Sequence, residues 1–483
     1  MSMSDTDPWA DDLLGRREEA LAITSYIESM ASSTLKREDK QAFTLAIDAD
    51  YGIGKSFFVR RLAEAMKVNH PVAFVDAWAD DLADEPFVAL AATLQKALAP
   101  LAVQRDGSDR LKDFMSKSGR VAKIISGGLL RRGLGLAISA VAVDALEAEL
   151  GGVADQVKDV VADGVAEASK ASVDDTFNGL SVSTTMEQRI AEFEDTKETI
   201  AELKYSLKRL VELLDTHETL HAPIVIFIDE LDRCRPTYSV KLLEEIKHLF
   251  DVPGIVFVLS MNGDQLCHSV SGAYGSGFDG RAYLRRFIDR RYQLSQPSLT
   301  PLLRVLFDQA GIRDDKFFWF SAVREDGRTS KWPLYETTAA YMTGLGLGAR
   351  DAYQVVDILR TCQALISEGR LIHPYLMPLI IGHIKGLPRG AIPQGWLGKE
   401  LRFRLPPATP ETVLSASELA SSFHSIALLP NKELLRRYNE DDTLSSCVVE
   451  NAGQYQSPEP LYSIRRYVDL LETVGRFDAP TSA

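Results

Sequence analysis

The stretch from residue 42 to residue 66 constrains the fold more than any other part of the sequence. Residues 42–49, AFTLAIDA, form a short apolar run, YGIGKS follows, and residues 55–66 place apolar side chains at helical spacing. A buried strand, a glycine-rich turn and a helix in this order are the context that a phosphate-binding loop requires. Such a loop turns backbone N–H groups and a helix N-terminus toward an anion. The sequence therefore predicts a nucleotide site at this turn.

One position departs from the usual pattern of these loops, G-x-x-x-x-G-K-[ST]. Ala49 stands where the first glycine belongs. If the backbone has a negative φ there, alanine fits at little cost, whereas a positive φ would strain the turn by roughly 1 kcal/mol or more. Taken alone, the string also fits a surface turn with an exposed lysine.

Strand and helix patterns alternate along the first part of the chain. Apolar runs suited to buried strands occur at 71–78, 222–232 and 254–262, and helical patterns occur at 85–101, 187–216 and 238–251. Unbroken apolar strands between helices favour a mostly parallel sheet that is covered on both faces. We therefore predict an α/β fold, a P-loop NTPase with a parallel sheet between helices.

The remaining segments differ in composition. Residues 102–186 are rich in Gly, Ala, Val and Ser with weak periodicity, so we interpret them as a helical insertion within a domain of residues 1–297. Beyond residue 297 the strand signals fade and helical patterns dominate. We predict that residues 298–483 form a mainly α-helical lid and partner-binding region.

Charge and cysteine usage exclude several classes of protein. A formal charge of −14 argues against broad non-specific binding to nucleic acid. Four scattered cysteines without a C-x-x-C pair, and histidines without a Cys/His cluster, give no sign of a disulfide framework or a structural metal site. The acidic N-terminus lacks the apolar core of a signal peptide. These features predict a cytoplasmic protein.

The one candidate for a membrane segment lies at 120–147. Its longest uncharged run, Gly133 to Val143, is shorter than the roughly 20 apolar residues that a spanning helix needs. A soluble Gly/Ala-rich helical hairpin is the favoured interpretation, and membrane association is the alternative.

Two motifs supply candidate catalytic groups. In the loop, Lys55 would contact the β- and γ-phosphates and the hydroxyl of Ser56 would bind Mg²⁺. After the apolar run at 224–228, Asp229 would hold Mg²⁺ and Glu230 would polarise the attacking water. Asn262, after the next run, could orient that water or simply cap the following helix. Because ligand sites of parallel sheets gather at the carboxyl ends of the strands, both motifs can serve one Mg-ATP.

Several motifs in order resemble those of the KAP family of P-loop NTPases, a branch of the additional-strand, catalytic-glutamate class. The matching strings are DLLGR (12–16), YGIGKS (51–56), FVDAW (74–78), IDELDRC (228–234) and YLRRFID (283–289). The resemblance implies that ATP is contacted by the following loop residues: Tyr51, Gly52, Ile53, Gly54, Lys55, Ser56 and Phe57. It covers residues 10–295 apart from the insertion.

The resemblance also extends to arginines and to the insertion. Glu230 replaces the commoner aspartate of the family, which brings the chain closer to an active hydrolase. Arg286 stands where the family has a lysine and could act as a finger to a neighbouring subunit, with Arg285, Arg290 and Arg291 as rivals. LGARDAYQVV (347–356) is similar to the arginine-bearing lid helix of related ATPases, which would place Arg350 at the nucleotide. Many family members carry transmembrane helices where this chain has the insertion, so we interpret it as a soluble counterpart for protein contacts.

The resemblance implies an ATPase that changes shape or assembly state with ATP and Mg²⁺ as cofactors. Soluble members of this kind resemble ATPase components of bacterial anti-phage defence operons, which implies other protein subunits of the same operon as partners and makes a homo-oligomer an option. Three alternatives stay open: an ATP-binding scaffold with little turnover, a membrane-tethered KAP NTPase, and, with no helicase motif to support it, a nucleic-acid translocase.

Overall fold

The computed structural model describes residues 7–35, 41–83, 85–103, 106–126, 186–275, 277–323, 327–366, 369–405, 413–451, 464 and 466–475. The chain forms two compact units. The first consists of the described residues within 1–21, 49–58 and 293–483, and the second of those within 22–48 and 59–292. The predicted boundary at residue 297 stays a prediction.

The second unit is built on a five-stranded sheet. Its strands lie in the order β2-β3-β4-β1-β5, and β2–β3, β3–β4 and β4–β1 pair in parallel. The strands are β1 (Phe43–Asp48), β2 (Val72–Asp76), β3 (Ile224–Asp229), β4 (Ile255–Met261) and β5 (Arg290–Gln293). The predicted parallel sheet is therefore confirmed, and each of the four predicted strand runs forms one of its strands.

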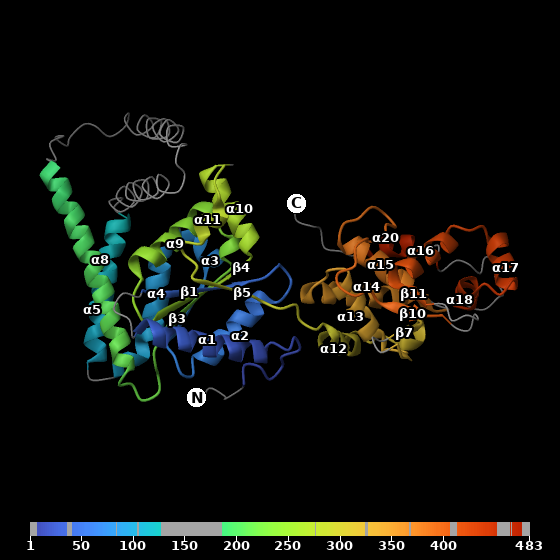
Figure 1. The fold of residues 1–483 in the computed structure, drawn as a ribbon, viewed down its shortest axis with the longest axis horizontal. Helices are drawn as coiled ribbons and strands as arrows, with labels where there is room; N and C mark the ends of the chain where they lie inside the picture. Colours follow the sequence, from blue (N-terminus) through green and yellow to red (C-terminus); the bar gives the residue numbers. More distant parts are fainter. Residues whose placement is uncertain are drawn as a thin grey trace. The chain divides into compact units, whose positions relative to one another are not determined.

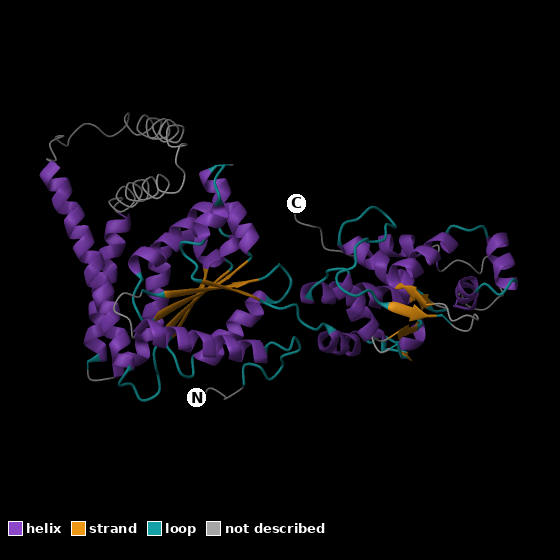
Figure 2. Cartoon of the chain, viewed as in Figure 1, coloured by secondary structure: helices purple, strands orange, loops and turns teal. Residues whose placement is uncertain are grey.

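Helices cover both faces of this sheet (Figures 1 and 2). All residues of β3 and β4 are buried, as expected for central strands covered on both sides. On one face lie α1 (Arg17–Leu35), whose Tyr26 packs on Phe43 of β1, and α2 (Lys55–Met66). The other face carries α9 (Pro236–Leu249) and α10 (Gly263–Tyr274). Shorter helical segments are α3 (Ala77–Asp80), η1 (Asp81–Ala83), η3 (Leu231–Arg233) and α11 (Gly280–Leu284).

Two long helices lie beside the sheet (Figure 1). The described part of the insertion begins with α5 (Gly107–Ser126), which packs against α8 (Met186–Leu214). Leu111, Phe114, Val121 and Ile125 of α5 are buried at helical spacing, so the prediction of weak periodicity is wrong for this segment. The predicted hairpin at 120–147 lies outside the described residues beyond residue 126.

The helix α4 (Pro86–Leu98) packs against β2, α5 and α9. Together with η2 (Ala99–Val103) it forms the described segment, Pro86–Val103, that by length and composition could cross a membrane, with 39% of that window buried. Core helices of water-soluble proteins meet the same criterion, so this is weak evidence for a membrane span.

The C-terminal part of the first unit is mainly helical, as predicted. Its helices are α12 (Thr300–Ala310), α13 (Leu334–Gly344), α14 (Ala349–Leu365), α15 (His373–Ile384), α16 (Ala416–Ala427), α17 (Asn431–Asn439), α18 (Thr443–Asn451) and α20 (Tyr467–Gly475). Six short strands accompany them within the described residues, so strands do not disappear beyond residue 297. They are β6 (Phe317–Phe318), β7 (Ser321–Val323), β8 (Thr329–Ser330), β9 (Leu371–Ile372), β10 (Arg402–Arg404) and β11 (Val413–Ser415). With two or three residues each, they are too short to give an alternating pattern.

Candidate nucleotide-binding site

The glycine-rich loop connects β1 to α2. Gly52 and Gly54 have φ values of 84° and 93°, a region that glycine occupies without steric cost. Ala49 does not have a positive φ, and its side chain is buried with 1% exposed. The substitution of the first loop glycine therefore follows the low-cost alternative, and alanine introduces no left-handed strain here.

Lys55 and Ser56 open the helix α2. The Lys55 ammonium donates a hydrogen bond to the carbonyl oxygen of Ala49 at 2.5 Å and lies 5.4 Å from the centre of the Tyr51 ring. This ammonium is thus held over the loop that it is predicted to serve. Phe57 packs against the hydrophobic core formed by residues of the C-terminal part.

A buried arginine holds the loop from the N-terminal side. The Arg16 guanidinium is 1% exposed and donates to the carbonyl oxygens of Ile53 at 3.0 Å and of Ser295 at 2.7 Å. It also forms an ion pair with Glu19 at 2.7 Å, and Glu19 accepts a hydrogen bond from the Ser295 amide. Because C=O and N–H point in opposite directions in a planar trans peptide, the grip on the Ile53 oxygen turns the Gly54 N–H away from Arg16.

Two further contacts surround the loop within the same unit. Leu14 packs so close to Gly54 that an added Cβ would lie 3.1 Å from its Cδ1. On α14, the Arg350 amide donates to the Gly52 carbonyl oxygen at 3.3 Å. Arg350 therefore lies beside the phosphate loop, as the resemblance implies, while its contact with a nucleotide stays a prediction.

The acidic motif lies at the carboxyl end of β3. Asp229 is its last residue and is 1% exposed. Its Oδ1 accepts the Glu230 amide at 3.0 Å, and the Arg60 Nε lies 3.9 Å from its Oδ2. Arg60 also pairs with Asp76, the last residue of the neighbouring strand β2, at 3.1 Å. The contacts of Arg60 with Asp229 and Asp76 were not predicted from the sequence.

Glu230 has a left-handed backbone with φ 60° and ψ 28°. A non-glycine residue in this region costs of order 1 kcal/mol or more and is found preferentially at functional sites. Its carboxylate pairs with Arg233 at 3.2 Å. Burial raises the pKa of Glu230 above its usual value, whereas the Arg233 guanidinium opposes that rise. Arg233 in turn lies over the ring of Trp78 at 5.7 Å.

Side-chain contacts connect the segments that contain two of the matching strings, FVDAW and IDELDRC. Arg235 donates through its Nε and its backbone amide to the Asp81 carboxylate, at 2.9 and 3.0 Å. Asp76 caps α3 by accepting the Ala79 amide. FVDAW and IDELDRC contact each other directly where the Arg233 guanidinium lies over the Trp78 ring.

The next strand end is organised by hydrogen bonds. Asn262 caps α10, its side-chain oxygen accepting the Gln265 amide at 3.1 Å, so the capping alternative is what the structure shows. A role for Asn262 at the γ-phosphate stays a prediction. Asp48, the last residue of β1, accepts the Gly263 amide at 2.8 Å and pairs with Arg291 at 3.3 Å.

The sequence also matches a known protein family. The sequence model of the KAP family P-loop domain matches residues 17–337. The chain belongs to the KAP family. Its P-loop domain fold, with a parallel sheet flanked by helices, agrees with that membership, and nucleotide binding is the shared property of such domains.

Other comparisons add little for this KAP chain. A search of curated proteins finds no significant match. Among solved structures, the Aeropyrum pernix ORC2 protein in its ADPNP-ADP complexes matches at 12% identity, covering 96% of this chain and 94% of that one, with a TM-score of 0.30. A likeness at this level supports no conclusion about activity.

The donor groups of the KAP site fit magnesium. A serine hydroxyl and a carboxylate are the hard oxygen ligands that Mg²⁺ prefers, and Mg²⁺ keeps its other positions for water and phosphate. Ser56, in the first unit, and Asp229, in the second, each carry such an oxygen, and their binding of one Mg²⁺ stays a prediction. Among the described residues, no group of three or more His, Cys, Asp or Glu side chains is placed to hold a metal, so a cage made by protein side chains alone is not seen there.

The candidate finger arginines of this KAP chain differ in their surroundings. Arg285, Arg286 and Arg290 are exposed, as a residue that reaches a neighbouring subunit must be. Arg291 is also exposed, but its guanidinium is engaged in the ion pair with Asp48. Arg291 is therefore the weakest rival, and the role of Arg286 stays a prediction.

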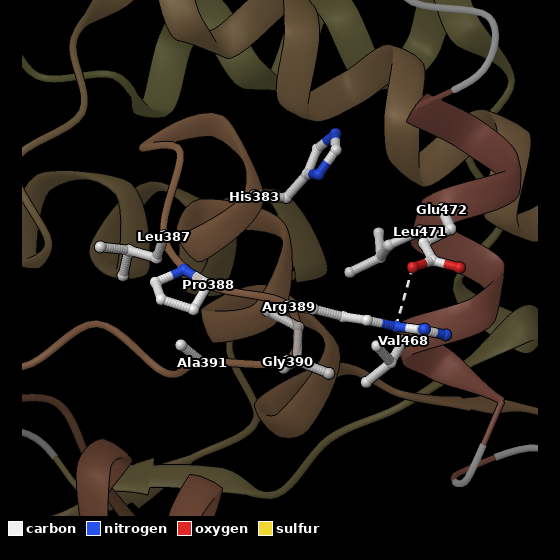
Figure 3. Close-up of a pocket in the computed structure, with 10 residues that line it drawn as sticks. His383, Leu387, Pro388, Arg389, Gly390, Ala391, Val468, Leu471 and Glu472 are labelled. Carbon is white, nitrogen blue, oxygen red and sulfur yellow. Dashed lines mark ion pairs between the residues drawn. The ribbon is translucent and has the colours of Figure 1, made fainter.

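A cavity of about 220 Å³ lies between α15 and α20 (Figure 3). Arg389 on its rim pairs with Glu472 at 2.8 Å and Asp469 at 2.6 Å. Its apolar lining includes Leu379 and Leu471. None of the predicted nucleotide-site residues lines this cavity, so it is separate from the KAP site.

Replacing Ala49 by glycine should leave ATP affinity and turnover within about twofold of the wild type, because there is no left-handed strain to relieve. Loss of the buried methyl and added chain entropy should lower stability by roughly 1 kcal/mol. Phosphate release and thermal unfolding measure the two effects. A large gain in turnover would show that Ala49 does impair the loop.

Replacing Arg16 by lysine should weaken ATP binding and lower the free energy of unfolding by about 2–4 kcal/mol. One ammonium cannot reach acceptors on three segments, and buried acceptors lose their donors. Arg17→Lys is the matched control, since Arg17 is exposed and pairs with Asp7 at the surface. Indistinguishable unfolding curves for the two variants would contradict the proposed anchoring.

Proposed function

We propose that the chain hydrolyses ATP with Mg²⁺ and uses turnover to change its conformation or the assembly of a multi-protein complex. The observation that carries this proposal is a buried aspartate followed by a strained glutamate at the carboxyl end of β3. In the same sheet, the carboxyl end of β1 leads directly into the phosphate loop. Strand ends of this kind meet at one edge of a parallel sheet, where ligands bind.

The residues divide the reaction between them. Lys55 and the loop amides bind the β- and γ-phosphates, while Ser56 and Asp229 would hold Mg²⁺, which when bound neutralises developing negative charge. Glu230 orients a water molecule and takes its proton as the water oxygen bonds to the γ-phosphorus and the bond to ADP breaks. The Arg233 guanidinium favours the ionised form of the Glu230 carboxylate, because it opposes the rise in pKa that burial causes.

The alternative of an ATP-binding scaffold with little turnover depended on one expectation, that Ala49 distorts the phosphate loop. Since Ala49 has no positive φ, that reason for slow turnover is lost. Hydrolysis is therefore the proposed function, and Arg286 is the candidate finger if the chain forms a homo-oligomer.

The biological role is a further part of the proposal. The resemblance of soluble KAP proteins to ATPase components of anti-phage defence operons supports a cytoplasmic role in such a system, with other subunits of the operon as partners. This part is supported by resemblance, whereas the catalytic part is supported by the site.

Glu230→Gln should reduce steady-state phosphate release by about 10²-fold or more while ATP binding is retained, because glutamine cannot accept the proton of water. The measurement is phosphate release together with equilibrium binding of ATP. Glu194→Gln, an exposed residue of α8, is the matched control. Equal turnover by wild type and Glu230→Gln would contradict the catalytic assignment.

The Glu230→Gln variant also tests whether partner proteins bind in the presence of ATP. Tagged Glu230→Gln protein purified from its native host with ATP should retain subunits of the same operon, identified by mass spectrometry. Recovery of the same proteins in the presence and absence of ATP would contradict nucleotide-dependent assembly.

A further inference from the structure

The phosphate loop and α14 meet through backbone atoms. Gly348 is the N-cap of α14, and a Cβ added there would lie 2.8 Å from the carbonyl oxygen of Gly52 and 3.0 Å from its carbonyl carbon. Distances this short are not tolerated between real atoms. The φ of Gly348 is −104°, which any residue can adopt. Space, and not backbone conformation, therefore requires glycine at this position.

The N-terminal end of α14 is held by a hydrogen bond and by buried neighbours where it meets the loop. The Gly348 amide donates to the Asp351 carboxylate at 2.7 Å, which closes the first turn of the helix. Leu347 and Ala349 on either side are 2% and 7% exposed. The Gly52 peptide therefore cannot shift toward α14 without moving the helix itself.

The contact also orients a phosphate-binding donor. The Arg350 amide donates to the Gly52 oxygen, and that oxygen shares a peptide plane with the Ile53 N–H. Since the two groups point in opposite directions in a trans peptide, the grip on the oxygen turns the Ile53 N–H away from α14. Backbone N–H groups of this loop are the donors that cradle phosphates. The orientation of one such donor is thus set by the helix.

Motion of α14 would spread through the C-terminal part. Ala352, Val355, Leu359 and Cys362 of α14 are each at most 1% exposed. They belong to a core shared with α12, α13 and α15. Packed interiors transmit displacement because they have little free volume.

We propose that Gly348 is a positioning residue for ATP hydrolysis, and that its packing on Gly52 couples occupancy of the phosphate loop to α14. By this contact a nucleotide that binds the loop amides reorganises the N-terminus of α14, and an altered α14 weakens nucleotide binding in return. The inference rests on the proposed function, since it takes ATP as the ligand of the loop.

The test compares Gly348→Ala with Gly119→Ala in the full chain. Gly119 lies in α5 with no atom within 4 Å of an added Cβ, so the control makes the same substitution without a clash. Binding of a non-hydrolysable ATP analogue with Mg²⁺ should weaken by about tenfold or more in Gly348→Ala, since small misplacements at such sites are costly. Gly119→Ala should bind as the wild type does.

A second measurement is hydrogen exchange, and its wild-type part stays decisive if Gly348→Ala does not fold. Saturating analogue should slow hydrogen exchange of the amides from Leu347 to Asp351 in the wild type, and this slowing should be lost in Gly348→Ala. Unchanged exchange in the wild type at saturation, or wild-type affinity in Gly348→Ala, would overturn the inference. Failure of the wild type to bind the analogue at all would overturn the proposed function instead, and the same titration reveals it.

Discussion

The buried guanidinium of Arg16 is the interaction on which the geometry of the phosphate loop depends. A charged group that is 1% exposed is tolerated only when its donors are satisfied. The two Nη atoms of Arg16 meet that requirement with the carbonyl oxygens of Ile53 and Ser295 and the carboxylate of Glu19, whereas its Nε is buried without a hydrogen-bond partner among the described residues. Three segments that are distant in sequence are thereby held together. The Arg350 amide grips the adjoining carbonyl of Gly52, so two successive peptide planes of the loop are oriented from outside it.

At the candidate site, the strained backbone is that of Glu230, the proposed general base, and not that of the phosphate loop. The loop needs a positive φ at Gly52 and Gly54, where glycine is present, and not at Ala49. Glu230, by contrast, adopts a left-handed conformation as a glutamate, at a cost of order 1 kcal/mol or more. The contacts that hold this turn are the Asp81–Arg235 and Glu230–Arg233 ion pairs. The replacement of the first glycine of the phosphate-loop motif by Ala49 therefore does not by itself indicate a distorted loop.

Much of the central sheet could be predicted from sequence because its strands are unbroken apolar runs between helices. The helix at 55–66 has the predicted bounds, and β1, β3 and β4 differ from prediction by one to three residues at each end. The strand β5, RRYQ, could not be found in this way because it carries two arginines and no apolar run. The short strands of the C-terminal part could not be predicted either, because two or three residues are too few to show an alternating pattern.

Side-chain partners were harder to predict than motifs. Lys55, Asp229 and Glu230 follow from spacing, whereas Arg60, Arg233 and Gly348 matter through contacts that only the tertiary structure creates. Arg233 lay inside the quoted string IDELDRC, three residues after Glu230, so its spacing was an available signal. Nothing near Gly348 in the sequence indicates its closeness to Gly52, since the two are 296 positions apart (348 − 52).

The most direct test of a nucleotide-binding phosphate loop with Ala49 is an isothermal titration of the full chain with Mg-ATP analogue, for the wild type and Lys55→Ala. The account predicts one bound nucleotide per chain for the wild type and a loss of affinity of about 10²-fold or more for the variant, because the lysine ammonium binds the β- and γ-phosphates. Equal affinity in both proteins, or no binding by the wild type, would contradict it.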